Sequence, residues 1–137
     1  MIELTRKSSL LKQAWELFET SIAKGELLQE SLTEEAFTEK VFLNQEKLSC
    51  IGLASPGGEG FAFGCTDFAQ KKNFITLVMV KEEERKKGIG TALLNALEER
   101  LLKEQETGGE VWNSKCEISF FNPLSLIHIS EPTRQEA

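Results

Sequence analysis

The chain has 137 residues, a formal net charge of −6 and 28% charged residues. This length fits one domain with a sizeable core, and the composition is that of a globular chain and not a disordered one. The acidic balance argues against a general nucleic-acid binder. No apolar run approaches membrane-spanning length, and no N-terminal stretch suits a signal peptide. We therefore expect a cytoplasmic protein that binds neither nucleic acid nor membrane.

The cysteines give no sign of a disulfide framework or a metal site. Cys50, Cys65 and Cys116 are far apart and odd in number, and no Cys-x-x-Cys pair occurs. With one histidine in the chain, the sequence predicts no zinc site. We interpret the three cysteines as free thiols in a reducing compartment, each a small buried residue and not a catalytic one.

The first third of the chain predicts a short strand and two helices. Ile2–Leu4 alternates like a strand. Ser8 or Ser9 can cap the first helix, which ends near Gly25 and carries apolar residues at helical spacing: Leu10, Leu11, Ala14, Leu17, Phe18 and Ile22. Thr33 can cap the second helix, whose apolar face consists of Phe37, Val41 and Phe42. An aromatic face of this kind is most simply part of the core.

A hairpin is predicted next. Lys47–Ala54 and Gly60–Phe68 have strand character, and Ser55–Gly58 between them (Ser-Pro-Gly-Gly) is a strong turn signal. The polar segment Ala69–Lys72 then leads into a third strand in this part of the chain. These patterns favour antiparallel pairing of the two strands.

The stretch from Asn73 to Leu102 organises the rest of the chain. An apolar, β-branched strand, Phe74–Val80, is followed by a charged loop and by a helix with apolar residues at helical spacing: Ile89, Ala92, Leu93, Ala96, Leu97 and Leu101. A strand, a glycine turn and a helix N-terminus together form an anion site, because free N–H groups and the helix dipole point at one place. Gly88 and Gly90 allow close approach of a bulky anion, and positive charge comes from Arg85, Lys86 and Lys87. A phosphate or pyrophosphate is the expected guest.

Two other phosphate-binding motifs do not fit this loop. A dinucleotide-binding fingerprint requires a third glycine where this chain has Leu93. A P-loop requires a lysine before the Ser/Thr, but Gly90 is followed directly by Thr91. One more strand is predicted at Lys115–Phe121, ended by Asn122 and Pro123. The order is therefore strand, two helices, three strands, helix and strand, an α+β fold with a mixed sheet.

The loop resembles the acetyl-CoA-binding motif of the GNAT family of N-acetyltransferases. Val80 is followed five residues later by Arg85, and Arg85–Leu94 reads Arg-Lys-Lys-Gly-Ile-Gly-Thr-Ala-Leu-Leu, which matches Arg/Gln-x-x-Gly-x-Gly/Ala between the fourth strand and third helix. The alternative is a surface turn before an ordinary amphipathic helix. The element order resembles the first two thirds of the GNAT-like acyl-CoA N-acyltransferase fold, β-α-α-β-β-β-α-β, without its last helix and strands.

The resemblance implies acetyl-CoA as co-substrate and a set of residues that bind it. Met79 and Val80 would give backbone contacts to the acetyl group and pantetheine, and the pyrophosphate would lie against Arg85, Lys86, Lys87, Gly88, Ile89, Gly90 and Thr91. Asn122 falls near an asparagine that often contacts the cofactor in the family. In the family the first two helices flank the acceptor groove, so the aromatic face of the second helix could also border that groove.

No catalytic acid or base can be assigned from the sequence. Members of the family often use a Glu on the fourth strand, but Phe74–Val80 has no ionisable side chain, and they often use a Tyr where this chain has none. Glu59 and Asp67 could reach a site, but a solvated surface carboxylate is the simpler interpretation of each. Glu82–Glu84 is interpreted as a solvated loop that keeps the site from binding anions indiscriminately.

We expect the last residues to have a different origin. Leu124–Arg134 is similar to the in-frame translation of a widely used transposase-based sequencing adapter, and Gln135–Ala137 could be the index bases that follow it. We therefore expect an incomplete GNAT-like domain at residues 1–123 and a non-native tail at 124–137. The single histidine, His128, would belong to that tail and could not be a catalytic base.

Three functions remain open from the sequence. The first is transfer of an acetyl group from acetyl-CoA to a primary amine of an unknown small-molecule or peptide acceptor, without activity in the truncated form. The second is a non-catalytic module of the same fold that binds CoA or a partner. The third possibility is a fragment that never exists as a folded protein. Neither the acceptor nor the oligomeric state follows from the sequence.

Overall fold

The computed structural model describes residues 1–27, 30–43, 46–107 and 119–120. The expected element order is found, with one short 3₁₀ helix added between the fourth strand and the third helix. The elements are β1 (Ile2–Leu4), α1 (Leu10–Ala23), α2 (Glu34–Val41), β2 (Leu48–Ala54), β3 (Gly60–Asp67), β4 (Lys72–Val80), η1 (Glu82–Glu84), α3 (Ile89–Thr107) and β5 (Ser119–Phe120). The predicted α+β class is confirmed.

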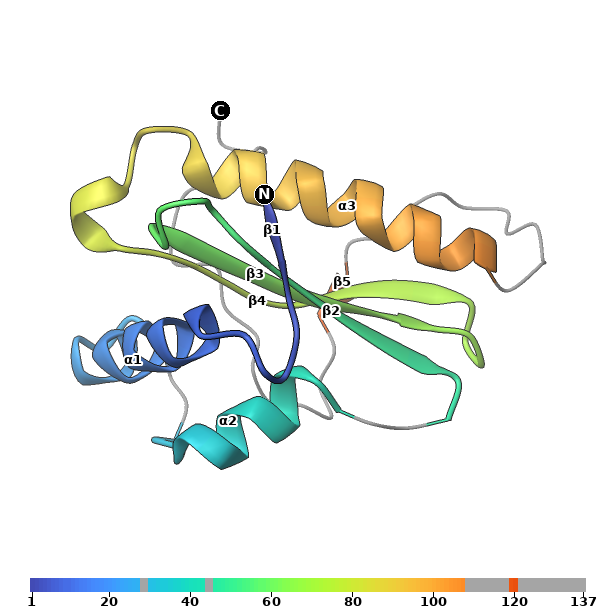
Figure 1. Cartoon of the computed structure of the whole chain (residues 1–137), viewed down its shortest axis with the longest axis horizontal. Helices are drawn as coiled ribbons and strands as arrows, with labels where there is room; N and C mark the ends of the chain where they lie inside the picture. The colour runs from blue at the N-terminus through green and yellow to red at the C-terminus, as the bar shows by residue number, and fades with distance from the viewer. Residues whose placement is uncertain (28–29, 44–45, 108–118, 121–137) are drawn as a thin grey trace.

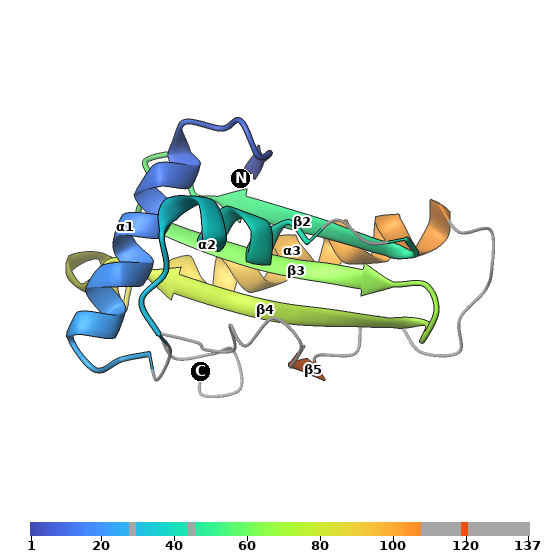
Figure 2. The same ribbon diagram turned by 90° about the horizontal axis from the view of Figure 1, so that it is seen from below.

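One mixed sheet separates two helical layers. Its strand order is β1-β2-β3-β4-β5, with antiparallel pairing among the first four strands and parallel pairing of β5 with β4. Helices α1 and α2 cover one face and α3 covers the other (Figures 1 and 2). Because both faces are covered, β3 is buried at every position and β4 at every position after Lys72.

The ends of the first two helices follow local signals. Gly25, at φ +76°, ends α1 in a Schellman motif, because Glu26 N donates to Ser21 O and Gly25 N donates to Ile22 O. Thr33 caps α2 by accepting from Ala36 N, as predicted. Ser9 occupies the N-cap position of α1, but its side chain makes no capping hydrogen bond.

The aromatic face of α2 belongs to the core. The ring centroid of Phe37 lies 5.0 Å from that of Phe18 and 5.9 Å from that of Phe63. The ring centroids of Phe42 and Phe63 are 6.1 Å apart. Phe37 is fully buried, and Phe42 is 9% exposed. These contacts between α1, α2 and β3 confirm the core interpretation and leave no part of Phe37 to border a groove.

Close packing of α3 on the sheet depends on a small residue near the end of β4. Gly60 on β3 pairs with Val80, and a Cβ at Gly60 would lie 2.8 Å from Leu93 Cδ1 and 3.2 Å from Ile89 Cγ2. A larger residue there would push the first turns of α3 away from the strand. The sequence therefore places the start of α3 directly over the end of β4.

Several expectations fall on residues outside the described ranges. Of the predicted strand Lys115–Phe121, only β5 is described, where Ser119 pairs with Phe74 and Phe120 with Ile75. Asn122, Cys116 and the tail 124–137 lie outside. Within the described residues, no helix combines the length and the apolar character that crossing a bilayer requires.

Candidate functional site

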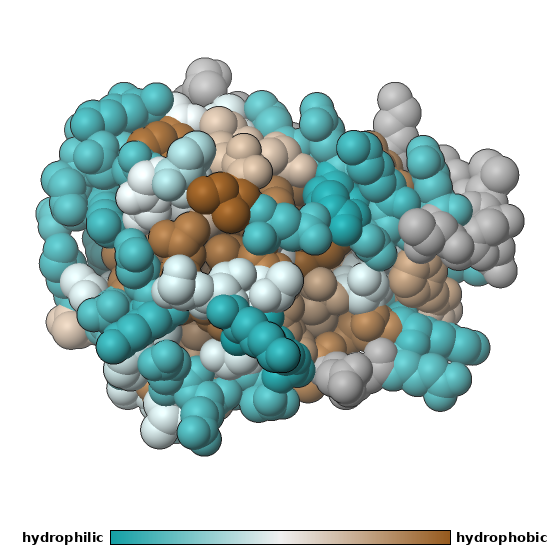
Figure 3. Space-filling view, viewed as in Figure 1, coloured by the Kyte–Doolittle hydropathy of each residue, from teal (hydrophilic) through white to brown (hydrophobic). Residues whose placement is uncertain are grey.

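The candidate site begins where β4 ends. Met79 and Val80 are fully buried, with Met79 in the core under α1 and α2 and Val80 in the core under α3. The chain then forms the β4–α3 loop, which we define as residues 81–88, and enters α3 at Ile89. This loop projects at one end of the molecule, where its surface is hydrophilic (Figures 1 and 3).

The backbone of the β4–α3 loop turns sharply before the helix. Lys86 has φ +67° and Gly88 has φ +82°. A Cβ at Gly88 would meet no atom of the described residues within 4 Å, so the need for glycine here comes from the backbone angle. Left-handed residues in a loop help to form concave N–H arrangements that bind anions, and the N-terminus of α3 begins in the next residue.

Arg85 departs from the sequence expectation. We expected its charge to surround the anion, but its Nη1 and Nη2 atoms bind the Glu26 carboxylate at 2.6 and 2.9 Å. Its Nε donates to the carbonyl oxygen of Val80 at 3.0 Å. The side chains are 18% and 26% exposed, so this is a half-buried, bidentate pair. The guanidinium therefore anchors the β4–α3 loop to the end of β4 and to the segment after α1.

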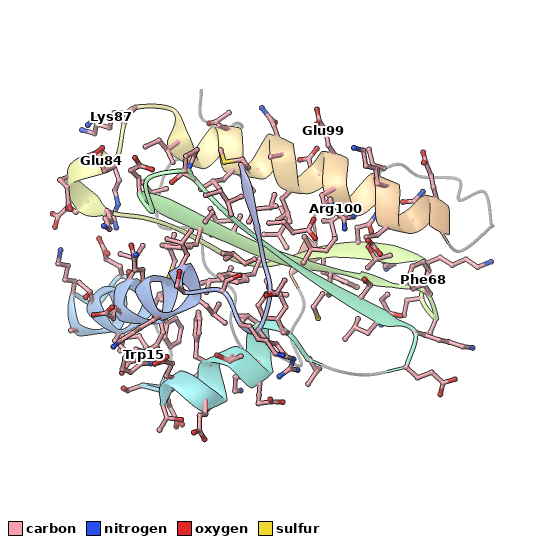
Figure 4. The ribbon with its side chains drawn as sticks, in the orientation of Figure 1. Trp15, Phe68, Glu84, Lys87, Glu99 and Arg100 are labelled. Atoms are coloured by element: carbon pink, nitrogen blue, oxygen red, sulfur yellow. The ribbon has the colours of Figure 1, made fainter. Side chains whose placement is uncertain are left out.

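The remaining charges of the loop are also largely paired. Lys87 Nζ lies 2.8 Å from Glu84 Oε2 (Figure 4), and Lys24 Nζ on the C-cap of α1 lies 2.5 Å from Glu82 Oε2. The hydrogen bond with Glu84 raises the pKa of Lys87, and the hydrogen bond from Lys24 lowers the pKa of Glu82. Lys86 is exposed, and no ion pair to it is found among the described residues. The expected solvated run Glu82–Glu84 is thus a 3₁₀ turn with two paired carboxylates.

The two carboxylates on the hairpin lie at opposite ends of the sheet. Glu59 precedes Gly60, which pairs with Val80, so it lies near the site. It accepts from Ser55 Oγ at 2.6 Å and from Gly57 N at 3.0 Å, and the bond from Ser55 lowers its pKa. Asp67 pairs with Lys72 at the far end.

The expectation of solvated carboxylates is therefore wrong for Asp67 and incomplete for Glu59. Asp67 is 9% exposed and accepts from Ala69 N, Gln70 N and Gln70 Nε2. Both carboxylates shape the turns on which they lie. A carboxylate with a lowered pKa is a poor general base at neutral pH, so Glu59 is not assigned that role.

A hollow lies beside the β4–α3 loop. It has a volume of about 280 Å³ and runs between the outer face of α1 and the start of the loop, lined by Gln13, Glu16, Leu17, Thr20, Lys24, Lys81, Glu82 and Glu83. Its lining is mostly polar and charged.

The structure brings together most of the residues that the motif predicted. Met79, Val80 and the run from Arg85 to Thr91 form one continuous strand–loop–helix unit, with Gly90 buried and Thr91 half-buried in the first turn of α3. Asn122 lies outside the described residues. Sequence reasoning missed Glu26, which is 59 positions from Arg85 and has no local signal beyond its place after Gly25.

One comparison with known proteins identifies a family, and another finds solved structures with the same fold. The sequence profile of the acetyltransferase (GNAT) family matches residues 9–116. A search of curated protein sequences found no match. Among solved structures, a GNAT-family acetyltransferase of Staphylococcus aureus has a TM-score of 0.55 and 22% identity, over 88% of this chain and 98% of that one.

Two further structures extend the comparison. An aminoglycoside acetyltransferase from an uncultured soil metagenomic sample, in complex with sisomicin, has a TM-score of 0.53 and 12% identity, over 89% of this chain and 77% of that one. The ribosomal-protein-S18-alanine N-acetyltransferase of Escherichia coli has a TM-score of 0.49 and 18% identity, over 75% of this chain. The chain spans 60% of the length of that enzyme. The family profile covers most of the chain, so this protein belongs to the GNAT acetyltransferase family.

Proposed function

We propose that this protein transfers the acetyl group of acetyl-CoA to a primary amine. The observation that carries the proposal is the strand–loop–helix unit at the end of β4. The exposed loop residues Lys86–Gly88, two of them with left-handed backbone, lead directly into the N-terminus of a 19-residue helix. Such a unit suits the pyrophosphate of CoA, because its N–H groups and helix dipole favour a bulky anion.

The remaining steps follow from the chemistry of acetyl transfer. The thioester carbonyl must be polarised by an N–H group, and we assign this to the backbone near Met79 and Val80. The amine must be held in line with the thioester and must lose a proton. The hollow beside α1 is the place where we put the acceptor, which is a small-molecule or peptide amine.

Two matched glycine variants test cofactor binding. Gly88 and Gly58 both have positive φ, +82° and +75°, so alanine at either position strains the backbone by about 1–2 kcal/mol. At Gly58 the new Cβ would also lie 2.7 Å from Gln13 Oε1, so that flexible side chain would have to move. Only Gly88→Ala should weaken binding of acetyl-CoA, measured by calorimetry, because Gly58 lies in the β2–β3 turn. Equal affinity in both variants, or no binding by the parent protein, would reject the site.

A second function is favoured by one observation. The strand from Phe74 to Val80 carries no ionisable side chain, and the nearby Glu59 is held by Ser55. A module that binds CoA without chemistry would have this property. Release of free CoA from acetyl-CoA in the presence of an amine panel, abolished in Gly88→Ala, would exclude it.

The domain limits are part of the same proposal. We place the acetyltransferase domain at residues 1–123 and the adapter-derived tail at 124–137. Amplification of the gene from its source DNA, read beyond the codon for Pro123, tests this directly. A frame that continues into other residues supports the proposal, whereas a frame that reproduces Ile129–Ala137 contradicts it.

A further inference from the structure

We propose that Glu26 is a positioning residue of the β4–α3 loop, which it sets for the cofactor by holding the Arg85 guanidinium against the end of β4. This inference rests on the proposed function, because the loop is taken to bind the CoA pyrophosphate. Under this proposal Arg85 anchors the loop, whereas its charge had suggested direct contact with the phosphate.

The geometry of the pair indicates a fixed arrangement. Both terminal nitrogens of Arg85 bind the Glu26 carboxylate, at 2.6 and 2.9 Å, in the bidentate form that fixes the guanidinium plane. With 18% and 26% of the two side chains exposed, solvent screens this pair less than an ordinary surface pair. The arrangement is therefore a rigid joint between two segments far apart in the sequence.

The third guanidinium nitrogen, Nε of Arg85, connects the Arg85–Glu26 pair to β4. Arg85 Nε donates at 3.0 Å to the carbonyl oxygen of Val80, the last residue of β4. Glu26 in turn has a backbone fixed by α1, since its N–H closes the Schellman motif on Ser21 O at 2.9 Å. A continuous set of contacts thus runs from the end of α1, through two side chains, to the point where the β4–α3 loop begins.

The same contacts argue for positioning and against competition with phosphate. All three guanidinium nitrogens already donate to Val80 or Glu26. We therefore assign the phosphate contact to backbone N–H groups and the exposed Lys86, and not to the guanidinium. If Glu26 instead competed with phosphate for Arg85, its removal would release a cation and CoA would bind more tightly.

Glu26→Gln separates these possibilities, with Glu82→Gln as the matched control. Both changes keep side-chain size and remove one negative charge beside the loop, but Glu82 belongs to an exposed pair with Lys24. For Glu26→Gln we expect roughly tenfold weaker binding of CoA by calorimetry, within the range of couplings between linked sites. Hydrogen exchange should also be faster in the peptide spanning residues 81–93. Glu82→Gln should change neither measurement.

The CoA affinity of a double variant separates a shared role of Glu26 and Arg85 from general destabilisation of the protein. Arg85→Gln can still donate to Val80 but cannot pair with Glu26 in the same way. If the two residues act as one unit, Glu26→Gln/Arg85→Gln should bind CoA no more weakly than the weaker single variant. Additive losses would contradict the proposal.

The outcomes separate this proposal from the proposed function. Unchanged or tighter CoA binding in Glu26→Gln, or unchanged exchange in residues 81–93, overturns the positioning role. If the parent protein and Glu82→Gln bind neither CoA nor inorganic pyrophosphate, the proposed function fails. The exchange comparison still decides in that case whether Glu26 sets the loop.

Discussion

The two connections of β4 are built in different ways. The turn from β3 into β4 is closed by its own carboxylate, since Asp67 accepts from Ala69 and Gln70. The β4–α3 loop is held by a half-buried pair that reaches outside it, from Arg85 to Glu26, while the pair of Glu82 with Lys24 is exposed. The first turn satisfies its polar groups within a few residues, while the second leaves Lys86 and Gly88 exposed. This difference supports the proposal that the β4–α3 loop binds the cofactor, whereas the turn from β3 into β4 is structural.

The largest expected effect concerns the closed turn. Asp67→Ala removes three hydrogen bonds from a side chain that is 9% exposed. We expect the free energy of unfolding to fall by about 2 kcal/mol, as judged from urea denaturation, with CoA affinity unchanged in the folded protein. Glu83→Ala in the exposed part of the other loop is the control and should leave stability unchanged. Loss of CoA affinity in Asp67→Ala would remove the distinction between the two connections.

Two buried threonines test how polar groups are satisfied beside the closed turn and in the middle of β4. Thr66 donates to Asn73 Oδ1 at 2.8 Å beside the closed turn. The buried Thr76 hydroxyl in mid-strand has no hydrogen-bond partner among the residues that the structure describes. Thr76 is the extra residue at the register shift, since Phe63 pairs with Leu77 and Gly64 with Ile75.

The two valine variants should have effects of opposite sign. Thr66→Val should lower the free energy of unfolding by about 1 kcal/mol, and Thr76→Val should raise it by about the same amount. The midpoint of thermal unfolding should shift down in the first variant and up in the second. The reason is that one change removes the hydrogen bond from Thr66 to Asn73 Oδ1 and the other removes the buried hydroxyl of Thr76. Destabilisation by Thr76→Val would show that its hydroxyl has a partner in solution.

Thiol labelling of the unmodified protein tests how closed the sheet is at Cys50. Cys50 on β2 lies directly opposite Cys65 on β3, and burial raises the pKa of Cys50 to about 11 and that of Cys65 further. At pH 7.5 we expect Cys50 to react with iodoacetamide roughly two orders of magnitude more slowly than free cysteine, with a rate that rises as pH increases. Peptide mapping separates this signal from Cys116. Labelling of Cys50 at the rate of free cysteine would show that this part of the sheet opens to solvent.

The smallest effect concerns the exposed pair on the β4–α3 loop. The hydrogen bond from Lys24 lowers the pKa of Glu82 below its ordinary value of 4.5, so its contribution to stability is present above that pH and is lost as pH falls through the lowered pKa. Glu82→Gln should therefore lower stability slightly at neutral pH, where the carboxylate contributes, and make the stability curve flatter on its acid side, where that contribution is lost in the parent protein. A loss of stability near pH 7 equal to that of Arg85→Gln would contradict the ranking of the two pairs.

Local sequence signals predicted the elements well. Apolar spacing placed α1 and α3, Thr33 and Gly25 marked helix ends, and the Ser-Pro-Gly-Gly turn marked the β2–β3 hairpin. The glycines of the β4–α3 loop and the family resemblance predicted a candidate site in this strand–loop–helix unit, and the unit itself is found in the structure. These features depend on neighbours within a few residues, so the sequence carries them directly.

The side-chain partners of the site were not predictable in this way. The three consecutive basic residues suggested a cluster of free positive charge, but Arg85 pairs with Glu26 and Lys87 with Glu84. Cys50 and Cys65 looked unrelated in the sequence and are cross-strand neighbours. Antiparallel register and the position of α1 decide which charges and thiols meet.

The sequence by itself determined the order of elements, the glycine turn before α3 and the family. Only the tertiary structure decided that Arg85 anchors the β4–α3 loop, because its partner comes from the other helical layer, 59 positions away. The physical reason is that helices, turns and caps form from short-range contacts, whereas the pairing of a half-buried charge depends on which distant carboxylate the folded sheet brings within reach.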